Sequence, residues 1–207
     1  MPSRASSYAN LFPLEGGCAC GYVRYRVNRA PLVIHCCHCT ACQRETGGPF
    51  AINAIIEAEH VELLPSADAS VPWNKTALEI AQGGPPLEIK SPFVAGASST
   101  VCIATPTESK NPQLIYRCRV CATALWSCYG PSAPRDFVRY IRASTLDRAR
   151  EVAPDAHIFV ASKRDFIALT DGKPQFQALY QAIDVYRPES QARLNALMIK
   201  IKREMQA

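Results

Sequence analysis

The chain has 207 residues, 48% of them hydrophobic, which suffices for one domain with a real core and short extensions. No run approaches the roughly twenty apolar residues of a membrane span, and the first ten residues lack the apolar centre of a secretory signal, so we expect a soluble, cytoplasmic protein with reduced thiols. The net charge of +5 is spread along the chain, which argues against nucleic acid and weakly favours an anionic small-molecule substrate.

The apolar pattern along the chain is mostly short and strand-like. In the segment 21–27, Val23, Tyr25 and Val27 alternate with other residues, as in a strand buried on one face. Similar runs predict strands at 32–34, 50–56, 61–64, 87–90, 100–104, 114–116, 124–129, 137–141 and 157–160. The sequence therefore predicts a mainly β fold.

Short helices are expected near the C-terminus. A short helix is predicted from Pro174 to Ile183, and Pro188 suits the first turn of a last helix. The last helix carries an apolar stripe, expected to pack on the protein's own body or, alternatively, in a homodimer contact: Leu194, Leu197, Met198, Ile201 and Met205.

The middle of the chain is rich in turn residues. Seven of the sixteen prolines fall between residues 65 and 112, which indicates a loop-rich insertion at about 66–112. We therefore divide the chain into an N-terminal tail (1–13), a β domain that contains the insertion (14–180) and a C-terminal amphipathic helix (181–207).

Two outer cysteine pairs have the spacing of a closed metal site. Cys18 and Cys20 lie two residues apart, so an extended strand directs both sulfur atoms to one face. Cys118 and Cys121 form a C-x-x-C turn. Four thiolates complete a tetrahedral structural zinc site, which these two pairs can supply together.

A third cluster contains Cys37, Cys39 and Cys42. Three protein ligands with one exchangeable position are typical of a catalytic zinc. The cysteine count thus predicts two zinc ions per chain with different roles. A redox role for these three thiols is the alternative.

Other cysteines and histidines lie near these clusters or in apolar runs. Cys102 and Cys128 are expected in the core. Cys36 should point away from Cys37 on an extended strand, as a spare ligand, a redox thiol or a packed residue. For His35 and His38 we expect a packing or supporting role rather than direct ligation.

Several residues after the triplet are candidates for contacts with a substrate. Arg44 can pair with a substrate carboxylate through its planar guanidinium, or it is an ordinary surface arginine. Glu45 can shuttle a proton or form a salt bridge. The backbone amides of Gly47 and Gly48 can approach a ligand, and His157 is either a structural histidine or a substrate contact.

The order of these motifs is similar to that of a known family. C-x-C-G at 18–21, C-H-C-x-x-C at 37–42 and C-x-x-C at 118–121, followed by His157-Ile158-Phe159 and Ser162-Lys163, resemble the glutathione-dependent formaldehyde-activating enzymes, a family that includes centromere protein V. The resemblance covers roughly residues 14–180. It implies a β-rich fold around a structural zinc on the outer pairs, and a second zinc on the triplet beside which a glutathione adduct binds. The implied reaction is the reversible joining of formaldehyde and glutathione, a carbon–sulfur lyase activity.

Two departures from the family pattern affect this expectation. Ala122 follows Cys121 where the family commonly has glycine, so a backbone with positive φ would be strained there. The stretch between Cys42 and Cys118 is also expanded, which can reshape the pocket.

The sequence therefore leads to three hypotheses for the function. The first is a zinc-dependent lyase that acts on a glutathione or related thiol adduct. The second is a related zinc enzyme redirected to a specialised-metabolism substrate by elimination, hydration or decarboxylation. The third is a non-catalytic zinc module that binds a partner through its basic terminal helix.

Overall fold

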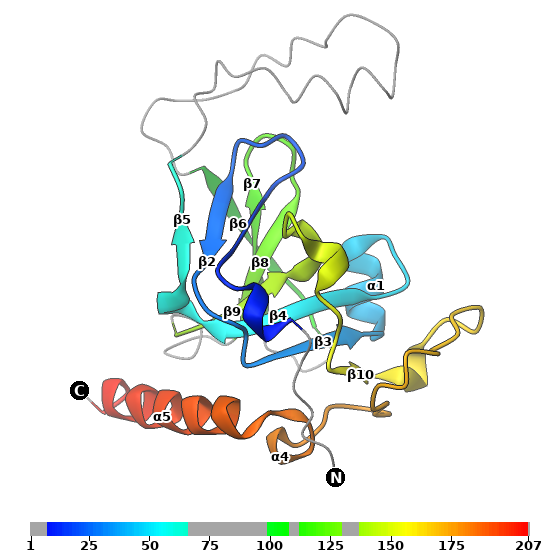
Figure 1. Ribbon diagram of the computed structural model, residues 1–207. Coiled ribbons are helices and arrows are strands. Elements are labelled where there is room, and N and C mark those ends of the chain that lie inside the picture. The colour runs from blue at the N-terminus through cyan, green and yellow to red at the C-terminus, as the bar shows by residue number, and fades with distance from the viewer. Residues whose placement is uncertain (1–7, 66–98, 108–111, 130–136, 207) are drawn as a thin grey trace, which may run out of the picture.

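A computed structural model describes residues 8–65, 99–107, 112–129 and 137–206 (Figure 1). The described residues form two β-sheets. The smaller sheet has the order β1 (Leu14–Gly17), β2 (Arg24–Val27), β5 (Val61–Leu63), and the larger has the order β10 (Ala156–Ile158), β3 (Val33–Cys37), β4 (Ala51–Glu57), β9 (Val138–Arg142), β8 (Ala124–Tyr129), β7 (Gln113–Cys118), β6 (Thr100–Thr105). All neighbouring strands are antiparallel except β10 and β3, which are parallel. The predicted mainly β fold is thereby confirmed.

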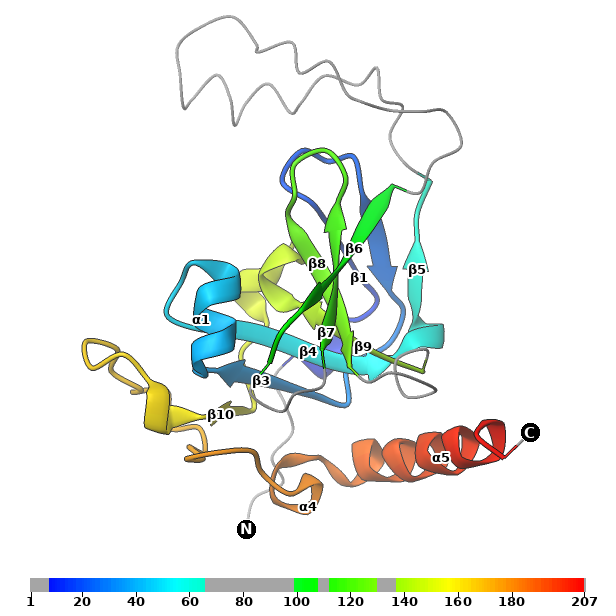
Figure 2. The ribbon, with the colours of Figure 1, turned by 180° about the vertical axis from the view of Figure 1, so that it is seen from behind.

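Helices are few and short in the described residues. They are α1 (Thr40–Thr46), α4 (Ala182–Val185) and α5 (Pro188–Glu204), with 3-10 turns at Ala9–Leu11, Ala58–His60, Ala143–Thr145, Ala149–Glu151 and Val160–Ser162. Helix α1 connects β3 to β4, and α5 lies beyond β3 at one end of the β body in both views (Figures 1 and 2). In the described part of the chain, no helix has both the length and the apolar character needed to cross a membrane.

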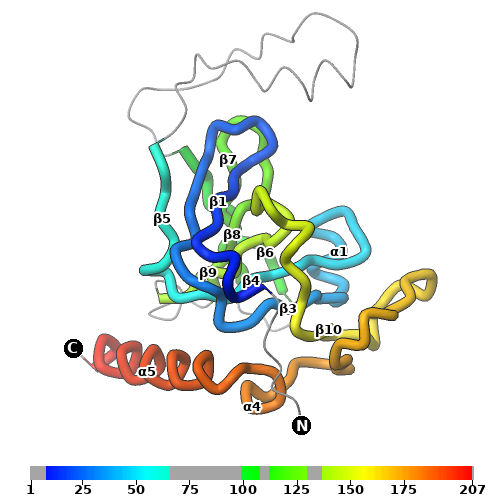
Figure 3. The backbone as a smooth tube through the Cα atoms, in the orientation of Figure 1, coloured from blue at the N-terminus to red at the C-terminus, as the bar shows by residue number. Residues whose placement is uncertain are grey.

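The main core lies between the two sheets, and the path of the backbone from one to the other can be followed in Figure 3. Tyr25 of β2 is fully buried, and its ring meets the ring of Trp126 from β8 edge to face at 6.1 Å between centroids. Ile34, Ala54 and Ile141 of the larger sheet join this core from alternate strand positions. Because alternate residues point to opposite faces, the intervening positions of the same strands form a second, outer face.

Most predicted strands appear close to their expected bounds, but one predicted element is wrong. The segment 174–181 is not helical. The His157 N–H donates to the Pro174 carbonyl (2.8 Å) and the Phe176 N–H donates to the His157 carbonyl (2.9 Å), so this segment covers the edge of β10. An edge strand has unpaired backbone groups, and satisfying them outweighed the helical spacing of the apolar residues.

Other expectations have mixed outcomes. Cys128 is buried as predicted, whereas the prediction of a core position for Cys102 is wrong. Cys102 is exposed because β6 is an edge strand of the larger sheet. Most of the proposed insertion, including the strand expected at 87–90, lies outside the described residues, so the domain division stays a prediction.

Helix α5 packs on the protein's own body, with Pro188 in its first turn as expected. Leu197 and Ile201 are buried with Leu32, whereas Met198 and Met205 of the predicted stripe are exposed. The apolar face of α5 is therefore narrower than the sequence suggested.

A buried ion pair holds α5 to β4. The Arg193 guanidinium donates to both Glu57 carboxylate oxygens, at 2.8 and 2.5 Å, and to the carbonyl of Ala30 at 2.8 Å. Burial by itself raises the pKa of Glu57. The hydrogen bond and charge of Arg193, together with smaller contributions, outweigh burial and hold this pKa below its ordinary value. Glu57 is therefore ionised at neutral pH and depends on Arg193 as its partner.

We expect Arg193→Met to lower the free energy of unfolding by about 3 kcal/mol, because Glu57 is left buried without its counter-ion. Denaturant unfolding measures this change. The matched control is Lys200→Met on the same helix, whose pair with Glu59 is exposed and should contribute little. Equal losses of unfolding free energy in Arg193→Met and Lys200→Met would contradict a stabilising role for the buried pair of Arg193 and Glu57.

Candidate metal centres

Four cysteines from two distant turns converge at one end of the sheets. Cys18 and Cys20 lie between β1 and β2, and Cys118 and Cys121 lie between β7 and β8. All four Sγ atoms lie within 4.8 Å of one another, with 3.4 Å between Cys18 and Cys20 and 3.7 Å between Cys20 and Cys118. Four thiolates around a tetrahedral zinc are about 3.8 Å apart, since each Zn–S bond is about 2.3 Å. The donor set and its spacing thus fit a closed zinc site.

The protonation of this four-cysteine cluster also suits a cation. Hydrogen bonds from Cys118 and Cys18 hold the pKa of Cys121 far below its ordinary value, while the pKa of Cys118 is strongly raised by the same contact with Cys121. Burial raises the pKa of Cys20 to about 12. Without an ion, the neighbouring sulfurs cannot all be deprotonated at neutral pH. A divalent ion removes this restriction, because it stabilises every sulfur as thiolate.

The turn that presents Cys121 is strained. Ala122 has φ of 59°, which confirms the positive φ expected at this position. Its N–H donates to the Cys118 carbonyl at 3.0 Å and closes the turn. Alanine is disfavoured in this region by about 1–2 kcal/mol relative to a right-handed conformation.

We expect Ala122→Gly to raise the free energy of unfolding by about 0.5 kcal/mol. Relief of about 1–2 kcal/mol of strain exceeds the roughly 0.4–1 kcal/mol lost through the greater entropy of the unfolded chain. Ala124→Gly, in the neighbouring strand β8, is the control and should destabilise. A loss of stability in Ala122→Gly would show that the strain is absent.

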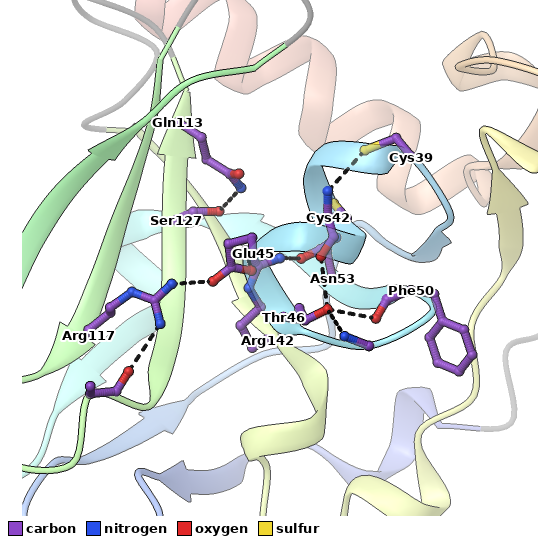
Figure 4. Close-up of polar contacts among 12 residues, drawn as sticks. Cys39, Cys42, Glu45, Thr46, Phe50, Asn53, Gln113, Arg117, Ser127 and Arg142 are labelled. Carbon is purple, nitrogen blue, oxygen red and sulfur yellow. Dashed lines mark hydrogen bonds and ion pairs between the residues drawn. The ribbon is translucent and has the colours of Figure 1, made fainter. Parts of the chain in front are cut away.

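The second cluster forms where β3 ends and α1 begins. Cys37 ends β3, Cys39 is the N-cap of α1, and Cys42 lies in its first turn. Their Sγ atoms lie within 4.8 Å of one another. Cys39 Sγ accepts a hydrogen bond from the Cys42 N–H at 3.4 Å (Figure 4). Hydrogen bonds from Cys37, Cys42 and backbone amides lower the pKa of Cys39 to about 2, so this cluster holds a thiolate at neutral pH.

These three cysteines open into a cavity of about 510 Å³ on the outer face of the larger sheet. Its described walls are mostly apolar or aromatic and carry no charged side chain apart from the cysteine sulfurs: His35, Ala41, Asn53, Thr107, Gln113, Tyr129, Tyr140, Ile158, Phe159 and Leu179. Three ligands beside an open cavity have the form of a catalytic zinc site, in contrast to the closed four-cysteine cluster. The three-cysteine cluster therefore fits an open zinc site, and the four-cysteine cluster fits a closed one.

The described lining of this cavity orients neutral hydrogen-bonding groups. Asn53 Oδ1 accepts from Arg142 at 2.5 Å, which leaves its amide N–H groups as donors. Burial lowers the pKa of His35 to about 4 and raises that of Tyr129 above its ordinary range, so at neutral pH both groups are uncharged. Phe159, beside them, has φ of 55°, and a bulky residue in this conformation is the kind of strain found near functional sites.

Four other substrate-contact candidates lie in two places, and neither place is the cavity at the triplet. Arg44, Gly47 and Gly48 lie together in a separate hollow of about 460 Å³, which also contains Arg164. Neither Arg44 nor the two glycines line the cavity at the triplet. His157 is in the second place, buried among protein groups. The structure therefore does not bring the four predicted contacts into one site.

Glu45 lies in a salt-bridge network. Its two carboxylate oxygens accept from Arg117 of β7 and Arg142 of β9, each at 2.6 Å, as Figure 4 shows. Only 3% of the Glu45 side chain is exposed. The carboxylate thus joins α1 to the larger sheet and neutralises Arg142 beside Asn53, which favours the salt-bridge alternative over a proton shuttle.

We expect Glu45→Gln to lower the free energy of unfolding by about 3 kcal/mol, since it leaves the buried Arg142 without a counter-ion, and to leave the zinc content unchanged. Thermal or denaturant unfolding and metal analysis check the two effects. Glu151→Gln, whose pair with Arg148 is exposed, is the control and should change little. A fully stable Glu45→Gln would show that the network is not structural.

Several residues of the cavity were not predicted from the sequence. Asn53 is a polar interruption in the apolar run of β4, a signal that could have identified it. Tyr129 and Tyr140 come from β8 and β9, and their rings meet edge to face at 4.9 Å between centroids. Nothing in their local sequence indicates that they share a cavity with Cys37.

Comparison with known families agrees with this arrangement. Residues 13–83 match the sequence model described as glutathione-dependent formaldehyde-activating enzyme. Over these residues the chain is similar to this family. Within the match lie five of the seven clustered cysteines: Cys18, Cys20, Cys37, Cys39 and Cys42. The fold brings the other two, beyond the family match, to the first pair. No curated protein matches the chain.

Proposed function

We propose that this chain is a zinc-dependent lyase that makes or breaks a carbon–sulfur bond in a thiol adduct. The observation that supports this proposal is the convergence of Cys37, Cys39 and Cys42 on a cavity of about 510 Å³, beside a separate closed cluster of four cysteines. We propose one zinc ion in each cluster. When bound at the triplet, zinc supplies a Lewis acid with an exchangeable coordination position.

The chain's own residues bind and orient the substrate in this proposal. Tyr129 and Tyr140 supply flat apolar walls and phenol groups that remain protonated, because burial raises both pKa values. The amide of Asn53, fixed by Arg142, donates toward a substrate oxygen. His35 is neutral at pH 7 and can hold or release a proton at one ring nitrogen, while its Nδ1 lies 3.2 Å from the Tyr180 hydroxyl.

The charge of the cavity favours the second function, a redirected substrate. Glutathione carries two carboxylates, and a buried carboxylate needs a cation or several donors. The described lining of the cavity contains no lysine or arginine, and Arg44 lies in another hollow. A largely uncharged, aromatic adduct therefore fits this cavity better than a glutathione adduct does. Elimination, hydration or decarboxylation of such a substrate is the alternative chemistry.

The partner-module alternative finds less support. Arg193 and Lys200 of α5 are paired with Glu57 and Glu59 of the same chain. A small-molecule substrate thus remains our proposal, together with a cytoplasmic location where thiols stay reduced. We also propose a homodimer contact through Met198 and Met205, which are exposed.

The test combines metal analysis with an assay of thiol adduct formation from formaldehyde. We expect two zinc ions in these clusters, and in Cys39→Ser the loss of one of them with a fall in activity of about 100-fold or more. Cys102→Ser, which changes an exposed cysteine outside both clusters, is the matched control and should retain metal and activity.

The substrate class is read from the same assay with two thiols. We expect the protein to react with benzyl mercaptan in preference to glutathione, because benzyl mercaptan brings an aromatic ring and no carboxylate into the cavity. A Cys39→Ser variant with full zinc content and full activity would overturn the proposed catalytic site. Preference for glutathione would retain the site and reject the redirected substrate.

A further inference from the structure

A third group of side chains with potential metal ligands lies on the other face of β3. Cys36 lies in this strand, His38 directly follows its last residue, and His157 lies in β10. Their ligand atoms all lie within 4.8 Å of one another, and the three residues are 2%, 0% and 5% exposed. We infer that Cys36, His38 and His157 bind a third ion, of a transition metal such as zinc.

The backbone holds these three residues in place. Cys36 and His157 are directly paired in the parallel register of β3 and β10. His38 follows Cys36 by two residues, and its N–H donates to the Ile158 carbonyl at 3.0 Å. The donors therefore converge through strand pairing, which requires no loop to close around an ion.

The hydrogen bonds of His157 select the nitrogen that a metal needs. His157 Nε2 lies 2.9 Å from Asp171 Oδ2, so this nitrogen carries the proton and Nδ1 presents a lone pair. His157 Nδ1 in turn lies 3.1 Å from His38 Nε2. A carboxylate behind a ligating histidine is the common arrangement in zinc proteins, where it fixes the ring and increases its basicity.

His38 supplies an independent observation. Its Nδ1 atom is buried and has no hydrogen-bond partner among the described residues. A buried imidazole normally engages both of its nitrogens. Among the described residues the His38 ring is hydrogen-bonded only to His157, through its Nε2 atom, so an ion bound by these two nitrogens would replace a single protein hydrogen bond.

The donor set also restricts the kind of ion. One thiolate and two neutral imidazoles suit zinc or copper(I) and disfavour magnesium or calcium, which prefer oxygen. The thiolate and the nearby Asp171 carboxylate together balance a divalent charge. Cys36 is absent from the described lining of the triplet cavity, so a role as a nucleophile there is not supported. The third ion is therefore structural, joining β10 to β3 directly behind the triplet.

Cadmium-113 NMR of the full chain tests this inference, after metal removal under reducing conditions and reloading with the isotope. We expect three resonances, one of them shifted away from the two sulfur-only sites by its nitrogen ligands. Cys36→Ser and, separately, His157→Asn should each remove this resonance and retain the other two. Cys128→Ser replaces a buried cysteine outside the three groups, so it is the matched control and should keep all three.

Two resonances in the unaltered chain, or a third that persists in both variants, would overturn the inference. Nitrogen-15 spectra of the histidine rings give a readout without any substitution: metal should shift the signals of His38 and His157, and unchanged signals would also overturn it. Neither measurement depends on catalysis. The test of the third metal site is therefore independent of whether the proposed lyase activity is found.

Discussion

The alternation of side chains at the end of β3 is the constraint on which the donor groups depend. Successive residues of a strand point to opposite faces of its sheet. Cys37 and Cys39 thus meet Cys42 on the outer face, while Cys36 and His38 meet His157 on the other. A shift of one residue in the pairing of β3 with β4 would exchange the two sets. The register of this strand pair therefore determines which sulfur atoms reach the cavity.

The four-cysteine cluster has a complementary role, because it joins turns of different sheets. Cys18 and Cys20 belong to the β1–β2 connection, and Cys118 and Cys121 to the β7–β8 connection. Backbone amides support these sulfurs: Val23 donates to Cys18 at 3.2 Å and Val120 to Cys118 at 3.3 Å. An ion held there would close the end of the core that contains Trp126 and Tyr25. The cavity of the triplet lies on the outer face of the same large sheet, so its walls rest on this core.

The sequence was sufficient for features whose signal is local. Cysteine spacing identified the groups that the fold brings together, alternation identified most strands, and the missing glycine at Ala122 correctly indicated a positive φ. Features that depend on distant partners were missed. The segment after Pro174 has helical spacing but is needed to cover β10. A salt bridge was one alternative for Glu45, but its two arginine partners, which lie on other strands, were not identified. Such contacts become visible only when the pairing of the sheet is known.

The electrostatics of the cavity connect its structure to the choice of substrate. Three thiolates around a divalent ion leave a net negative charge, which repels carboxylates and weakens a Lewis acid. Arg142 is the nearby cation, but its guanidinium is already engaged by Glu45 and Asn53. An adduct that carries two carboxylates would therefore meet both repulsion and a lack of partners in the described cavity. A neutral aromatic adduct avoids both, and its orientation would come from fixed neutral donors. A cysteine arrangement similar to that of the family thus lies beside a cavity whose described walls carry no cation that could pair with a carboxylate.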